Sequence, residues 1–177
     1  KLIVTSIYGI CKSLYNKYLL SKESVIPNAN TAIIIASMDW FSPYEWIISP
    51  YSYNFKEFFK YLKLKGIRYV VFTDISPKEF DKVVYNKKYK NIHLFGHGSR
   101  HSFTLNKNSI IYYCKYSNKK IIKDFVAQWH CNHGKGSSLA EYIVPNPQKR
   151  RLCYIGNDYH FLLYVNRKIK NMYKEAN

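Results

Sequence analysis

Residues 91–100 read NIHLFGHGSR, and residues 123–134 read KDFVAQWHCNHG. Each segment is an apolar run that reaches a reactive side chain: His97 stands directly before Gly98, and Cys131 stands shortly before Gly134. Short apolar runs rich in aromatic and β-branched residues are typical of buried strands. We therefore expect two neighbouring strands of one sheet, one ending in an imidazole and the other in a thiol.

The chain on both sides of these two segments alternates between apolar strands and amphipathic helices. Strands are predicted at residues 31–37, 68–74, 91–97, 124–130 and 151–156, with a shorter strand or hairpin arm at 109–116. Helices are predicted at 54–66, 76–85, 137–142 and 161–173. This alternation implies right-handed crossovers and parallel pairing. The expected fold class is therefore α/β, a three-layer α/β/α sandwich with a mostly parallel central sheet.

The starts of three predicted helices carry capping boxes, in which a side-chain oxygen and a glutamate three residues later satisfy free backbone N–H groups. These boxes are expected at Asn54 with Glu57, at Ser76 with Glu79, and at Ser137 or Ser138 with Glu141. Pro77 at the first helical position and Gly66 after a helix support the same boundaries.

The first 30 residues are expected to form an amphipathic helix and a linker, followed by one α/β domain over residues 31–177. The helix pattern rests on apolar residues spaced by three or four: Ile3, Ile7, Ile10, Leu14 and Tyr18. Such a stripe indicates a helix that docks on the domain, and a juxtamembrane or partner-binding helix is the alternative.

The composition is strongly basic, with 28 Lys and Arg against 11 Asp and Glu and a formal net charge of +17. The basic residues are spread over segments far apart in the sequence, such as 60–65, 87–90, 119–123 and 148–151. One interpretation of this charge is a solvated lysine-rich surface. The functional alternative is affinity for nucleic acid, an anionic membrane or an acidic partner.

The four cysteines, Cys11, Cys114, Cys131 and Cys153, form no CxxC pair, which argues against a zinc ribbon or a redox motif. So few cysteines in a chain of this size fit a reducing compartment, and a cytoplasmic location is expected. No apolar run is long enough to predict a transmembrane segment. Because the chain begins with Lys1, a regulatory partner domain or subunit upstream of residue 1 is also considered.

The two strand ends supply the groups that a cysteine nucleophile needs. A free thiol has a pKa of about 8.5, and only the thiolate is a good nucleophile. A histidine on a neighbouring strand can accept the thiol proton and later return it to the leaving amine. Tetrahedral intermediates also need donors for the oxyanion, and the backbone N–H groups of Gly98 and Cys131 are the candidates.

An apolar strand ending in His-Gly, followed along the chain by an apolar strand ending in Cys with Gly shortly after, resembles the caspase-like (clan CD) cysteine peptidases, which include caspases, legumains, gingipains and CHAT-domain proteases. The segments HLFGHGS and FVAQWHCNHG carry this resemblance. It implies a caspase-hemoglobinase-like fold without a cofactor or metal. It also implies a protein or peptide substrate cleaved through a thioester acyl-enzyme, with His97 as base, Cys131 as nucleophile, and Gly98 and Cys131 as the oxyanion hole.

In this family the connection after the first strand often contributes to the specificity pocket. Here that connection contains Asp39 and Glu45, so the resemblance implies a preference for a basic side chain before the scissile bond if either carboxylate lines the pocket. Surface or capping roles are the alternative for both. His133 and His101 are further candidates for substrate contacts.

Two other functions stay open. A metal-dependent hydrolase could use the cluster formed in sequence by His97, His101, His130, Cys131 and His133, provided that three or four of them converge. A non-catalytic, peptidase-like binding domain would instead contain Cys131 as an ordinary buried thiol.

Overall fold

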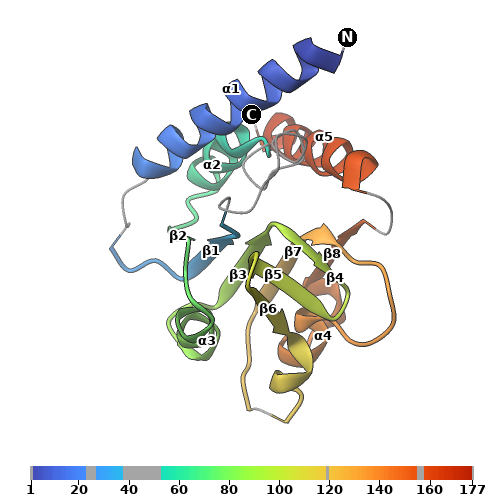
Figure 1. The fold of residues 1–177 in the computed structure, drawn as a ribbon. Coiled ribbons are helices and arrows are strands. Elements are labelled where there is room, and N and C mark those ends of the chain that lie inside the picture. The colour runs from blue at the N-terminus through green and yellow to red at the C-terminus, as the bar shows by residue number, and fades with distance from the viewer. Residues whose placement is uncertain (1, 23–26, 38–52, 119, 155–157, 177) are drawn as a thin grey trace.

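The computed structural model describes residues 2–22, 27–37, 53–118, 120–154 and 158–176. Five strands form the central sheet in the order β2-β1-β3-β7-β8, and every neighbouring pair is parallel (Figure 1). The strands are β1 (Thr31–Ile35), β2 (Tyr69–Thr73), β3 (Asn91–Phe95), β7 (Phe125–Cys131) and β8 (Arg150–Tyr154). The protein is therefore an α/β protein with a mostly parallel sheet flanked by helices, as the alternation in sequence predicts.

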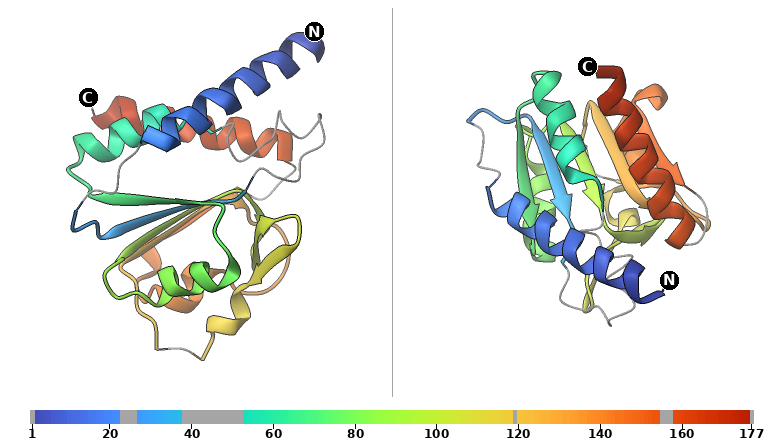
Figure 2. Two further views of the ribbon diagram at one scale, coloured as in Figure 1. Left: turned by 60° about the vertical axis from the view of Figure 1, so that its left-hand side comes forward. Right: turned by 90° about the horizontal axis from the view of Figure 1, so that it is seen from above.

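Helices cover both faces of the sheet (Figure 2). On one face lie α2 (Phe55–Leu64) and α5 (Asp158–Ala176), with α1 (Leu2–Lys22) crossing over them. On the other face lie α3 (Pro77–Tyr85), α4 (Leu139–Ile143) and the 3-10 helix η3 (Tyr113–Tyr116). A short 3-10 turn, η4 (Pro147–Lys149), precedes β8. The domain therefore has two hydrophobic layers, one on each side of the sheet.

The middle strands are buried on both faces, which explains their continuous apolar sequences. All five residues of β1 are buried, and its alternate side chains enter different layers: Ala32 and Ile34 pack towards α3 and α4, whereas Ile33 and Ile35 pack towards α2 and α5. The second layer is rich in aromatic rings, including Phe58 and Phe95, whose centroids lie 5.0 Å apart in an edge-on arrangement. Such pairs add stability beyond their buried area.

Two of the three expected capping boxes are confirmed. Ser76 with Glu79 starts α3, and Ser138 with Glu141 starts α4. The box expected at Asn54 is wrong, because the Asn54 side chain makes no capping hydrogen bond. The Asn54 side-chain oxygen instead accepts from Lys12 Nζ at 2.8 Å, and the Asn54 backbone N–H donates to the Asn166 side chain at 2.7 Å. The start of α2 is thus anchored to α1 and α5.

The predicted strand over residues 91–97 ends earlier than expected. Strand β3 stops at Phe95, and His97 begins a separate antiparallel sheet formed by β4 (His97–Ser99), β5 (Ser102–Asn106) and β6 (Ser109–Tyr112). The sequence indicated only a possible arm at 109–116, so this three-stranded sheet is the main element that it did not predict.

Gly96 makes the change of sheet possible. A Cβ atom at this position would lie 2.6 Å from the Ala36 Cβ atom and 3.0 Å from the Phe103 ring. The chain therefore leaves the central sheet through a gap that only a glycine fills without displacement.

The apolar stripe expected to dock α1 lies largely in solvent. Ile7, Leu14 and Tyr18 are 56%, 55% and 62% exposed, respectively. The helix instead contacts the domain through its other side, where Asn16 Nδ2 donates to the Tyr53 carbonyl at 2.8 Å and Leu20 is buried. Periodicity predicted the helix correctly but assigned the docked face wrongly, because the contact is made from another side of the helix by Lys12 and Asn16 together with Leu20. Among the residues placed in the structure, no helix is long and apolar enough to cross a membrane.

The Gly96 contact gives a prediction about stability. Gly96→Ala should lower the free energy of unfolding by about 1–3 kcal/mol, the usual cost of overpacking a close-packed core, as measured by urea denaturation. The double variant Gly96→Ala/Ala36→Gly removes the closest clash and should recover part of that loss. Equal stability of wild type and Gly96→Ala would show that the backbone relaxes around the added methyl group.

Candidate functional site

The ends of β3 and β7 lie side by side at the carboxyl edge of the sheet. These two strands pair in parallel from Asn91↔Phe125 to Phe95↔Trp129. His97 and Cys131 each follow the last of these pairs by two residues. In open sheets with this strand order, ligands bind beyond the carboxyl ends, near the point where the order reverses between β1 and β3. The predicted base and nucleophile are therefore both placed at this edge.

A tyrosine that sequence reasoning missed joins the two strand ends. The Tyr53 hydroxyl lies 2.6 Å from the carbonyl oxygen of Trp129 and 3.2 Å from that of Gly96. Tyr53 is buried directly before α2, and its ring packs edge-on against Phe95. Its hydroxyl thus fixes the spacing of the segments that lead into His97 and Cys131. No motif marked it among 18 tyrosines.

Cys131 is the last residue of β7, and only 3% of its surface is exposed. It belongs to the hydrophobic layer under α2 and α5, together with Trp129 and Phe95. Between Gln128 and Cys131 the pairing with β8 shifts, because three steps along β7 correspond to two steps along β8. Such bulges occur next to active sites, where they redirect a side chain. His97, at the start of β4, is partly exposed.

Gly98 packs tightly against the residue that precedes Cys131. A Cβ atom at position 98 would lie 2.5 Å from the Ser102 carbonyl oxygen and 2.8 Å from His130 Nδ1. The structure therefore brings the two expected oxyanion-hole segments together, and glycine is required for this approach. The sequence suggested glycine for access by substrate, whereas the observed neighbours are a backbone carbonyl and an imidazole.

His130 is fully buried on the face of β7 opposite to Cys131, and its contacts define its tautomer. Its Nδ1 atom lies 2.8 Å from the Cys131 carbonyl oxygen, which can only accept, so Nδ1 carries the proton. Nε2 then accepts from the Tyr113 hydroxyl at 3.0 Å. A neutral histidine thereby holds the peptide group that follows the candidate nucleophile.

Burial keeps His130 neutral. The pKa of His130 is lowered from 6.5 to about 4, mainly by loss of solvation; the hydrogen bond to the Cys131 carbonyl raises it, and the nearby His97 and His133 lower it. The pKa of Tyr113 is raised above its usual value by burial, so its hydroxyl keeps the proton that it donates. His130 is therefore a positioning group, whereas the sequence offered it only as a metal ligand.

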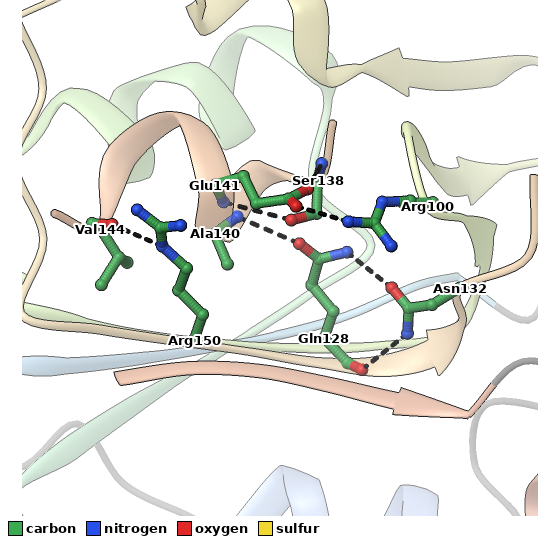
Figure 3. Close-up of polar contacts among 8 residues, drawn as sticks. All are labelled: Arg100, Gln128, Asn132, Ser138, Ala140, Glu141, Val144 and Arg150. Carbon is green, nitrogen blue, oxygen red and sulfur yellow. Dashed lines mark hydrogen bonds and ion pairs between the residues drawn. The ribbon is translucent and has the colours of Figure 1, made fainter. Parts of the chain in front are cut away.

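The turn after Cys131 and the helix α4 that follows it are held by side chains from β7 and β8 (Figure 3). Gln128 Oε1 accepts from the Ala140 backbone N–H at 3.2 Å, and Gln128 Nε2 donates to Asn132 Oδ1 at 3.0 Å. At the other end of α4, Arg150 Nε donates to the Val144 carbonyl at 2.8 Å. The chain that leads from Cys131 into α4 is thus held by β7, and the other end of α4 is held by β8.

The β4–β5 hairpin is fastened to the same turn. The Arg100 backbone N–H donates to the His133 carbonyl at 2.9 Å, and its guanidinium forms an ion pair with Glu141 (Figure 3). Burial raises the pKa of Glu141, but hydrogen bonds from Ser138 and Arg100 outweigh this effect and hold it below its usual value. His101 and His133 are both exposed near this contact. They border the site rather than fill it.

Other sequence-predicted groups are not assembled here. Asp39 and Glu45 lie outside the described residues, as does the Cys153 side chain. Within the described ranges, no three His, Cys, Asp or Glu side chains are arranged to hold a metal ion. The metal-hydrolase hypothesis therefore has no ligand set in that part of the chain.

Comparison with known proteins finds no matching family model, no similar curated protein and no similar solved structure. The class of protein defined by the fold is an α/β domain with a five-stranded parallel sheet, whose carboxyl edge brings His97, Gly98 and Cys131 onto adjoining elements.

The buried His130 makes stability depend on pH. Its pKa is about 4 in the folded chain and 6.5 without burial, so the unfolded state binds more protons between these values. The free energy of unfolding should be highest above pH 6.5 and fall as pH decreases towards 4, with about 3 kcal/mol from this group. Urea denaturation across this range measures the slope.

His130→Gln should flatten this slope, leaving the part due to His93, whose pKa burial lowers to about 3. His101→Gln is the matched control, because His101 is exposed and is not among the groups that act on the pKa of His130, so this variant should keep the wild-type slope. Equal slopes for His130→Gln and wild type would contradict a buried neutral imidazole.

Proposed function

We propose that this chain is a caspase-like cysteine endopeptidase that uses His97 and Cys131. The observation that carries the proposal is the register Phe95↔Trp129, which places both residues two positions beyond one pair at the carboxyl edge of a parallel sheet. The resemblance of the two motifs names these residues independently of that register.

In the proposed reaction, His97 accepts the thiol proton of Cys131 and the thiolate attacks the scissile carbonyl. The tetrahedral intermediate collapses to a thioester as the C–N bond breaks, and His97 returns the proton to the leaving amine. Water then attacks the thioester and releases the carboxylic acid, with the proton restored to the thiol. Protein atoms are therefore unchanged after one cycle.

The oxyanion would be held by backbone N–H groups of Gly98 and Cys131. The close approach of Gly98 to His130 supports this pairing, because it ties β4 to the end of β7. The His130 hydrogen bond to the Cys131 carbonyl restricts the backbone at the nucleophile. Preorganised donors of this kind contribute about 3–4 kcal/mol to transition-state stabilisation.

A non-catalytic binding domain is the second candidate, and the burial of Cys131 favours it. A thiol that is 3% exposed within an apolar layer is also what an inert core cysteine looks like. A catalytic Cys131 should react quickly with thiol reagents, whereas a core cysteine should react slowly, so the reactivity of Cys131 distinguishes the two functions.

Thiol labelling distinguishes these functions. Cys11 and Cys114 are exposed, so accessibility alone would make them react faster than Cys131. A nucleophile activated by His97 should reverse this order with iodoacetamide at pH 6.5, because only a thiolate of lowered pKa reacts quickly there. Mass spectrometry of tryptic peptides over time gives each rate.

His97→Ala should abolish the advantage of Cys131 and leave the rates of Cys11 and Cys114 unchanged. His133→Ala is the control, because His133 is exposed and lies near the same turn. This variant should keep Cys131 as the fastest-reacting thiol. If Cys131 reacts more slowly than both exposed thiols in wild type, the binding-domain function is favoured instead.

Peptidase activity gives an independent prediction. Wild type should generate new amino termini in a proteome-derived peptide library, detected by mass spectrometry. Cys131→Ala and His97→Ala should each reduce cleavage at least about 10³-fold, as losses of a nucleophile or its base do. Cys114→Ala should cleave as wild type does, and full activity in Cys131→Ala would exclude this mechanism.

A further inference from the structure

A cavity lies at the amino-terminal ends of the central strands β1, β3 and β7. It has a volume of about 620 Å³ and is lined by the first residues of three central strands, Thr31, Asn91 and Phe125, and by the later turns of α2 and α5. His97 follows the carboxyl end of β3 and Cys131 is the last residue of β7, and neither residue lines this cavity. Its volume falls in the range of small-molecule sites.

His93 presents a hydrogen-bond donor to this cavity. Its Nδ1 atom accepts from the Trp129 indole N–H at 2.9 Å, and an indole nitrogen can only donate. Burial lowers the pKa of His93 to about 3, so the ring is neutral and its proton is on Nε2. The hydrogen bond between Trp129 of β7 and His93 of β3 therefore fixes the orientation of the His93 ring and the position of its Nε2–H group.

The Nε2–H group of His93 is left for a ligand. No hydrogen bond joins it to any part of the chain that the structure describes, although His93 is only 6% exposed. No described side-chain nitrogen or oxygen is both sealed from solvent and unpartnered. Nε2 is therefore open to the cavity that His93 lines.

Charge and aromatic surface surround this donor. Trp129 and Phe125 form apolar walls, and the Trp129 ring lies nearly parallel to the His93 ring at 6.2 Å. Lys149, Arg151 and Lys168 line the cavity, against a single carboxylate, Asp124. The aromatic walls of the cavity match a ligand with an apolar ring, and the basic side chains match an anionic group. The unused N–H group of His93 can donate to a polar atom of the same ligand.

We propose that this cavity is a binding site for an aromatic anion, such as an aryl carboxylate or sulfonate. The ring packs between Trp129 and Phe125, and His93 Nε2–H donates to a polar atom of the ligand. The acidic group lies near Lys149, Arg151 and Lys168. This site is independent of the thiol chemistry proposed for the other end of the sheet.

Two fluorescent probes test the charge requirement. 8-Anilino-1-naphthalenesulfonate carries the ring system and an anion, whereas N-phenyl-1-naphthylamine is the same ring system without the sulfonate. Wild type should bind the sulfonate at least about tenfold more tightly than the neutral amine. A tenfold difference in affinity corresponds to only 1.4 kcal/mol, which attraction between the sulfonate and the basic side chains can supply. Equal affinities would overturn the proposal.

A pair of lysines on one helix provides matched variants. Lys168→Glu should weaken binding of the sulfonate about tenfold and change binding of the neutral probe less than about twofold. Lys170→Glu changes net charge equally, but Lys170 is exposed and does not line the cavity. It should therefore bind as wild type. If both variants weakened binding of the sulfonate equally, the probe would be attracted to the overall charge of the protein, and the proposed site would be overturned.

The position of the probe is measured by nuclear magnetic resonance. The indole N–H signal of Trp129, assigned with Trp129→Phe, reports on the bond to His93 and should shift when the sulfonate is added. Cys131→Ala should give the same shift, which keeps this test separate from the peptidase tests. Tight probe binding without a shift at Trp129 would place the probe elsewhere and overturn the proposal.

Discussion

Strand β7 is buried on both faces, yet it contains Gln128, His130 and the indole N–H group of Trp129, and the candidate site depends on how these polar groups are satisfied. An unpartnered polar group in such a position costs about 1–3 kcal/mol. Gln128, Trp129 and His130 each direct hydrogen bonds to a different element: the start of α4, strand β3 and η3. The strand is therefore fixed to its surroundings by specific bonds as well as by apolar packing.

These bonds fix the backbone around Cys131 from both faces of the sheet. His130 holds the carbonyl of Cys131 from one face, and Tyr53 holds the carbonyl of Trp129 from the other. Gly98 closes over His130 and brings the hairpin to the same point. The residue that carries the candidate thiol is thus anchored through its own carbonyl and through that of Trp129, two positions before it.

Much of the fold could be predicted from the sequence because its signals are local. The β-branched run at Thr31–Ile35 and the capping box of Ser76 with Glu79 indicate the same elements in isolation and in the structure. The apolar pattern of α1 also predicted a helix, but its docked face could not be read from it, since Asn16 makes the contact through a hydrogen bond to Tyr53. Long-range polar contacts of this kind leave no periodic signal.

The site was predictable only in its residue types and strand ends. His97 and Cys131 were selected by their positions after apolar runs, and the parallel register of β3 with β7 places the ends of both runs at one edge of the sheet. The tight packing at Gly96, which ends β3 and starts the hairpin, depends on Ala36 and Phe103, residues from other strand ends. The role of Tyr53 likewise depends on two carbonyl groups distant in sequence. Both sets of contacts join residues far apart in the chain, and no motif or periodic pattern in the sequence marks them.

The shortness of α4 has a consequence for the order of folding. A helix of five residues cannot persist alone, because its nucleation entropy exceeds what one turn of hydrogen bonds returns. Its ends are held by Gln128 from β7 and by Arg150 from β8, the final strand of the sheet. The turn that follows Cys131 therefore becomes rigid only after the central sheet has received its last strand. On a ribosome, Tyr53, Gly98 and Tyr113 would be synthesised before Cys131 but Arg150 only after it, so α4 would be fixed at both ends as one of the last steps of folding.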